Sequence, residues 1–137
     1  MRRIAVLAGA LLFAALAHAQ GYPSRPVRVI VPWPPGQATD IAARLVAQKL
    51  QEQLGQPFVV DNRPGAGGSI GTDAVAKSAP DGYTLLASSS GPVSIMPNLQ
   101  STPYDSIRDL APVSLTALAP FALVTNPESG GLSYFLN

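Results

Sequence analysis

Apolar and polar residues alternate along the chain in blocks that predict strands and helices in turn. The β-branched run from Val27 to Val31 is closed by Pro32 and predicts a strand. From Ala38 to Leu54 the apolar residues recur at helical spacing, and Gly55 provides a natural stop. Asp40 lies in the first turn of this predicted helix, where a carboxylate suits the positive end.

The same order repeats after Gly55. Residues 58–60 predict a second strand, residues 62–68 a glycine-rich loop and residues 69–79 a second helix. The turn Pro80-Asp81-Gly82 precedes a third predicted strand at 83–87. This alternation predicts an α/β fold in which helices flank a parallel sheet, with loops of functional interest at the carboxyl ends of the strands.

The pattern is weaker beyond Gly91. We expect a short helix at 95–99, a polar connection at 104–110, and two further strands at 113–117 and 121–124. Residues 128–137 neither complete an element nor continue the alternation, so we interpret them as a divergent tail.

The first nineteen residues resemble a secretory signal peptide. Arg2 and Arg3 form a positive start, residues 4–16 are almost entirely apolar, and Ala17-His18-Ala19 has the small-x-small pattern of a cleavage site. The apolar run is shorter than the ~20 residues that a membrane-spanning helix needs. We therefore expect export to the periplasm, with cleavage after Ala19.

Removal of residues 1–19 would restrict the available chemistry. The single histidine, His18, would leave, and the chain has no cysteine. Lys and Arg would fall from nine to seven against eight acidic residues, which gives a net charge of −1. Such a chain lacks the excess positive charge that is typical of nucleic-acid-binding proteins. The acidic residues are scattered, so no metal site and no cofactor are expected. Triads that need His or Cys cannot be built, and the sequence indicates binding, not an enzyme.

The glycine-rich stretch from Gly65 to Gly71 does not indicate a nucleotide site. Ile70 stands where the dinucleotide fingerprint requires Gly or Ala, and no Gly-Lys-Ser/Thr of a P-loop follows.

Three loops, at 33–37, 62–68 and 88–91, should meet at one rim of the sheet. Two of them lead into helix N-termini, whose free N–H groups suit an anion. The glycines in these loops fit either a ligand held by backbone amides or simply tight turns. Arg63 could clamp a carboxylate or pair with Asp61 or Asp40 to fix the loop, and we favour the pairing. Trp33 could be a pocket wall or a core aromatic, and we favour the wall.

Several linked motifs resemble one receptor family. The order Tyr22-Pro-x-Arg-Pro-Val-Arg, then Pro32-Trp-Pro-Pro-Gly-Gln-Ala-Thr-Asp, is similar to the opening of the tripartite tricarboxylate transporter receptors, the Bug or TctC family. The stretch Leu54-Gly-Gln-Pro-Phe-Val-Val-Asp-Asn-Arg-Pro-Gly-Ala-Gly-Gly-Ser-Ile-Gly resembles its most characteristic segment. Pro80-Asp-Gly-Tyr-Thr-Leu-Leu and Tyr104-Asp-x-x-x-Asp-Leu-Ala-Pro-Val follow in the family's order, and the resemblance covers residues 22–127.

This resemblance implies a periplasmic, two-lobed receptor of the type II periplasmic-binding-protein (Venus flytrap) class. Such a receptor binds a small organic acid or amino acid and delivers it to membrane transporter subunits. Residues 20–127 would be part of the first lobe. The implied ligand-binding residues are Trp33, Pro35, Gly36, Gln37, Ala38, Thr39, Asp40, Gly67, Gly68, Ser69, Ser88, Ser89 and Ser90. Gln37 stands where the family has a second glycine, so its side chain would enter or crowd the pocket.

Family members are much longer than this chain, and the family pattern stops near Ser129. We therefore expect a truncated, non-functional copy that ends before the second lobe. The alternatives are a small exported hydrolase, disfavoured by the missing His and Cys, and an interaction module without a pocket.

Export is directly testable. We expect mass spectrometry of the periplasmic fraction to find a chain that begins at Gln20, because signal peptidase recognises the small residues at 17 and 19. An exported chain that retains Met1 would contradict this prediction.

Overall fold

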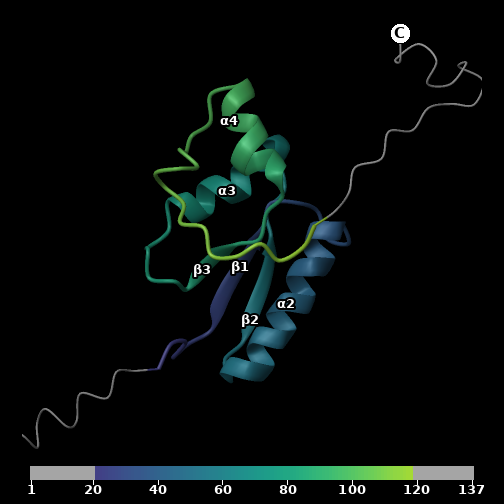
Figure 1. The fold of residues 1–137 in the computed structure, drawn as a ribbon, viewed down its shortest axis with the longest axis vertical. Helices are drawn as coiled ribbons and strands as arrows, with labels where there is room; N and C mark the ends of the chain where they lie inside the picture. The colour runs from purple at the N-terminus through teal and green to yellow at the C-terminus, as the bar shows by residue number, and fades with distance from the viewer. Residues whose placement is uncertain (1–20, 119–137) are drawn as a thin grey trace, which may run out of the picture.

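The computed structural model describes residues 21–118. Figure 1 shows a small parallel sheet with helices packed against it. The elements are β1 (Val27–Val31), α2 (Ala38–Leu54), β2 (Phe58–Asn62), the 3-10 turn η1 (Ala66–Gly68), α3 (Ser69–Ala76), β3 (Thr84–Leu86), the π-helical turn η2 (Gly91–Ile95) and α4 (Met96–Leu99). The expected signal peptide, the strand at 121–124 and the tail at 128–137 lie outside the described residues.

The three strands are arranged in the order β2-β1-β3, and β1 pairs in parallel with both neighbours. Val27 lies opposite Phe58 and Val31 opposite Asn62, while Ile30 lies opposite Leu86. The predicted alternation of strands and helices around a parallel sheet is therefore confirmed. Helical crossovers are the usual connection between parallel strands, because a hairpin cannot join them.

One face of the sheet packs against α2 and forms the core. Side chains alternate along a strand, so Val27 and Val29 share this face with Phe58, and they contact Ala47 of α2. Val27 is fully buried, and each aliphatic side chain that is buried in this way contributes about 1.5–3 kcal/mol. Leu50 of α2 packs around the same cluster.

The helix α3 covers the carboxyl-terminal part of the sheet. It packs most closely at Gly71, where an added Cβ would lie 2.8 Å from the carbonyl oxygen of Arg63 and 2.9 Å from the Cα of Pro32. Thr72, on the next position of the helix, is completely buried, and its hydroxyl donates to the carbonyl of Gly68 at 3.0 Å. The backbone of α3 thus lies directly against the ends of β1 and β2.

The predicted end of α2 at Gly55 is confirmed. Gly55 has a φ of +71°, and its N–H donates to the carbonyl oxygen of Gln51 at 3.0 Å, which ends the helix in the left-handed conformation that glycine accepts readily. α3 ends at Ala76, three residues before the predicted boundary. Among residues 21–118, no helix is both long and apolar enough to cross a membrane.

The strand predicted at 113–117 is wrong. Residues 111–118 have no regular structure, and Val113 and Leu115 are 87% and 75% exposed. Alternating apolar residues form a strand only where a neighbouring strand accepts their backbone hydrogen bonds, and within the described residues none lies beside them. The short helix predicted at 95–99 is present, but the helical segment begins earlier, at Gly91.

Substitution of Gly71 by alanine should destabilise the protein. Alanine normally stabilises a helix by about 1 kcal/mol relative to glycine. Here its Cβ would meet backbone atoms that cannot rotate away, and overpacking costs about 1–3 kcal/mol. We expect a lower thermal midpoint for Gly71→Ala. Gly21→Ala is the matched control, because nothing lies within 4 Å of a Cβ there; equal midpoints for the two variants would contradict the prediction.

Candidate functional site

Three loops meet at the carboxyl-terminal edge of the sheet: the first loop (residues 32–37), the second loop (63–68) and the third loop (87–90). The second loop packs against the first loop on one side and against η2, which follows the third loop, on the other. A Cβ on Gly68 would lie 2.4 Å from Cγ of Pro92 and 3.4 Å from Cβ of Pro32. Gly68 also has a φ of +91°, so both its conformation and its surroundings require glycine.

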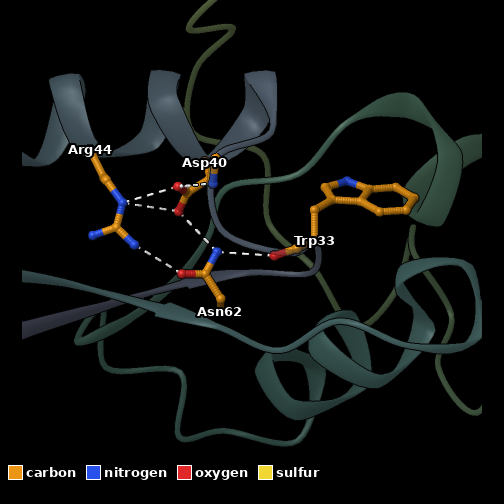
Figure 2. Close-up of polar contacts among 5 residues, drawn as sticks. Trp33, Asp40, Arg44 and Asn62 are labelled. Carbon is orange, nitrogen blue, oxygen red and sulfur yellow. Dashed lines mark hydrogen bonds and ion pairs between the residues drawn. The ribbon is translucent and has the colours of Figure 1, made fainter.

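The first loop is held by the carboxylate of Asp40 (Figure 2). Asp40 is only 2% exposed, in the first turn of α2. Its Oδ2 accepts the N–H of Gly36 at 2.9 Å, and both its oxygens accept from Nε of Arg44 at 3.1 Å. Gln37, the N-cap residue, makes no side-chain cap, and Asp40 instead reaches back past it to the N–H of Gly36.

Asn62 connects the end of β2 to both the first loop and α2. Its Nδ2 donates to Oδ1 of Asp40 at 2.9 Å and to the carbonyl oxygen of Trp33 at 3.0 Å. Its Oδ1 accepts from Arg44 at 3.0 Å. Figure 2 shows this amide lying between the helix and the loop. The side chain therefore joins the end of β2 to the first loop and the start of α2, which lie 18 to 29 positions earlier in the sequence.

The Asp40 carboxylate is strongly stabilised in its charged form. The hydrogen bond from Arg44, then those from Gly36 and Asn62, lower the pKa of Asp40 from 3.8 to about 2, against the opposing effect of burial. The guanidinium of Arg44 balances the negative charge of Asp40, and N–H groups of the protein donate to both carboxylate oxygens of Asp40.

Trp33 links the first loop to the third. Its indole Nε1 donates to Oγ of Ser89 at 3.2 Å, and the ring points away from the Asp40 cluster (Figure 2). Ser88 donates to the carbonyl of Ser89 at 3.2 Å, whereas Ser90 is exposed and precedes η2. The side chain of Trp33 is half-buried, so it is neither a core aromatic nor fully exposed to solvent.

The structure brings the expected site residues to this rim but exposes them unequally. Pro35, Gly36, Gln37, Ala38 and Gly67 are exposed, Thr39 is half-buried, and Gly68 and Ser69 are buried. Gly36 has a φ of +85° and open space around it. The N–H groups in the first turn of α2 have no intrahelical acceptor, and such groups suit a small anion. At the start of α3 the N–H groups of Gly68 and Ser69 are already bonded to the carbonyl oxygens of Gly65 and Ala66.

Arg63 has the structural role that was favoured from the sequence. Its Nε donates to Oδ2 of Asp61 at 3.1 Å. Arg28 pairs with the same carboxylate, and the hydrogen bond from Arg28 is the main reason that the pKa of Asp61 is lowered, with a smaller contribution from Arg63. Within residues 21–118 no three acidic or histidine side chains gather as metal ligands do.

Sequence reasoning missed three residues that organise the rim: Arg44, Asn62 and Tyr104. The pairing of Asp40 with Arg44 had a readable signal, because residues four apart lie on the same helix face. Asn62 was placed in a loop, and nothing local indicates that it faces α2. Tyr104 was placed in a polar connection, yet it is only 6% exposed.

Replacement of Asp40 by asparagine should remove an acid-sensitive part of the stability. The folded protein lowers the pKa of Asp40 below its unfolded value, so its contribution is complete above 3.8 and is lost as the pH falls toward about 2. We expect the thermal midpoint of Asp40→Asn to lie below wild type near neutral pH, and the difference to shrink between pH 4 and pH 2.

Glu52→Gln, which removes an exposed pair with Lys49, is the control and should change the midpoint much less. A wild-type advantage that stays constant down to pH 2 would contradict the role assigned to the Asp40 charge.

The sequence matches a family model over residues 42–131, and that model describes the tripartite tricarboxylate transporter family receptor. Protein BugT of Bordetella pertussis strain Tohama I is 56% identical over 117 residues, which cover 84% of this chain and 36% of that protein. A protein from the tcbD-tcbE intergenic region of Pseudomonas sp. strain P51 is 47% identical over 108 residues, covering 79% of this chain and 32% of the relative.

A solved structure described as a periplasmic transporter superposes with a TM-score of 0.61 at 48% identity, over 64% of this chain and 30% of that one. This chain spans about a third of the length of the curated relatives. The matches confirm both the family resemblance and the periplasmic-binding-protein class of fold. The chain belongs to the tripartite tricarboxylate transporter receptor family, the Bug family of solute-binding proteins.

Proposed function

We propose that the rim formed by the first, second and third loops is one wall of a ligand site in an extracytoplasmic receptor, and that the ligand is a small organic acid or amino acid. The carboxylate of the ligand would be held mainly by the main-chain N–H groups of Gln37 and Ala38 and by that of Gly67, because the N–H of Gly36 is already bonded to Asp40 and that of Gly68 to Gly65. The observation that carries this proposal is that the acidic side chain at this rim, Asp40, is buried and paired within the protein.

This pairing matters for an anionic ligand. A free aspartate at the rim would repel a carboxylate, but Arg44 neutralises Asp40 and holds it behind the first loop. The exposed backbone donors that remain in this stretch are the N–H groups of Gln37 and Ala38, at the positive end of α2. The rim therefore favours negative charge although Asp40 is one of its nearest side chains.

The expected site residues would take three kinds of role. Asp40 would position the first loop without touching the ligand. Trp33 and Pro35 would form apolar walls, and Gln37, exposed beside the N–H donors, would contact the ligand with its amide. The remaining contacts would come from Ala38, Thr39, Gly67, Gly68, Ser69, Ser88, Ser89 and Ser90.

The family also supports a location and a partner. We propose that residues 1–19 direct the chain to the periplasm, and that the receptor delivers its ligand to the membrane subunits of a tripartite transporter. The support is the family match and the similarity to a periplasmic transporter structure.

Nuclear magnetic resonance can test the site residue by residue. Titration of the ¹⁵N-labelled protein with malate, succinate, citrate and aspartate should shift the amide signals of Gln37, Ala38 and Gly67, and that of Gly68 beside them, along one saturable curve. Because the described rim is open to solvent and exposed polar contacts contribute about 0–1 kcal/mol each, we expect a dissociation constant of about 1 mM.

Gly82 is the internal control for this titration. It also has a positive φ, but it precedes β3 and so lies at the opposite end of the sheet. Neutral analogues of the same ligands should cause no shift. Shifts spread evenly over the sheet, or equal shifts at Gly82 and Gly67, would contradict the proposed site.

A further inference from the structure

Tyr104 is buried although it comes from a segment without strand or long helix. It is 6% exposed, and apart from the prolines it is the one buried hydrophobic residue of the described part that lies outside β1, α2 and β2. The expected ligand-binding residues do not include it. Its burial therefore requires an explanation from the groups that it contacts.

The phenol of Tyr104 lies between the first residue of α3, directly after the second loop, and the helical turn η2 that follows the third loop. Its hydroxyl donates to the carbonyl oxygen of Pro92 at 2.7 Å, and its Oη lies 3.4 Å from Oγ of Ser69. A carbonyl oxygen can only accept, so the single phenolic proton points to Pro92. Tyr104 is also the donor in the longer contact with Ser69, which therefore shares the same proton and is the weaker of the two.

The two segments that Tyr104 joins are also in direct contact. A Cβ on Gly68 would lie 2.4 Å from Cγ of Pro92, and one on Gly67 would lie 3.1 Å from Cε of Met96. The second loop has no side chains at these positions, so it has no side-chain anchor of its own toward η2 and α4. The hydrogen bond from Tyr104 supplies a directional attachment at this point.

The segment around Tyr104 is organised to present it. Oγ1 of Thr102 donates to the carbonyl oxygen of Tyr104 at 2.8 Å. Directly after it, Oδ1 of Asp105 accepts the N–H groups of Ile107 at 2.9 Å and Arg108 at 3.1 Å, which closes a turn. These local bonds orient a ring that would otherwise have no regular element to hold it.

We propose that Tyr104 is a positioning residue for the ligand rim, which fixes the start of α3, directly after the second loop, and η2 relative to each other so that the N–H of Gly67 is preorganised for a carboxylate. This inference rests on the proposed function. It extends that function because Tyr104 does not contact the ligand: its effect passes through Ser69 and Pro92. Preorganisation of this kind improves affinity by reducing the ordering that binding requires.

The test compares two tyrosine-to-phenylalanine variants. Tyr104→Phe keeps the buried ring and removes only the hydroxyl. Tyr22→Phe is the matched control, because its hydroxyl also donates to a carbonyl, that of Gly82 at 2.6 Å, but at the amino-terminal end of the sheet. We expect Tyr104→Phe to weaken succinate binding roughly fivefold, as the loss of one neutral hydrogen bond predicts. Tyr22→Phe should stay within about twofold of wild type.

Affinities are measured by the amide titration at a temperature at which circular dichroism shows all three proteins folded. If wild type binds none of the acids, the proposed function fails. If wild type binds and Tyr104→Phe binds equally well, the proposed function stands and the role of Tyr104 is rejected. Equal weakening by Tyr22→Phe would also reject it, because the effect would then follow general stability.

A second measurement needs no variant and decides the case in which Tyr104→Phe does not fold. In wild type labelled with ¹³C at the ring ε positions of tyrosine, succinate should shift the Tyr104 signal along the same curve as the amide of Gly68. The signals of Tyr22 and Tyr83 should not move. A Tyr104 signal that stays constant while Gly68 shifts would overturn the inference.

Discussion

Parallel pairing of β1 on both of its edges is the constraint on which the rest of this structure depends. Four of the five residues of β1 are buried, so the strand is stable only where both edges and both faces are covered. Parallel neighbours then require helical crossovers, and they place the ends of β1, β2 and β3 at one edge of the sheet. The candidate site exists because three loops must leave from that same edge.

The rim is built from backbone more than from side chains. Gly68 packs against Pro92, and Gly71 packs against Pro32 and the carbonyl of Arg63, with no room for a Cβ at either position. Such close approach fixes the path of the backbone at these two positions. A substitution at Gly68 or Gly71 would therefore destabilise the fold by steric overlap, whatever the polarity of the new side chain.

The buried, ionised carboxylate of Asp40 holds the first loop in place. An unpaired carboxylate in the position of Asp40 would be very costly, and removal of one partner from a buried pair is strongly destabilising. Arg44, Asn62 and the amide of Gly36 all donate to it, so the shape of the first loop is tied to one ionised group. Tyr104 holds the other side of the rim with a neutral group, through Pro92.

The sequence by itself determined the strands, the crossover helices and the loops of the rim. Each depends on patterns within about fifteen neighbouring residues, such as the helical spacing that ends at Gly55, and local patterns survive folding. Only the tertiary structure decided which polar side chains hold the loops of the candidate site together and which segments pair as strands. Asn62 meets Asp40 across 22 positions of sequence, and Tyr104 meets Ser69 across 35. The alternation at 113–117 predicted a strand, but a strand requires a partner that no local pattern can supply.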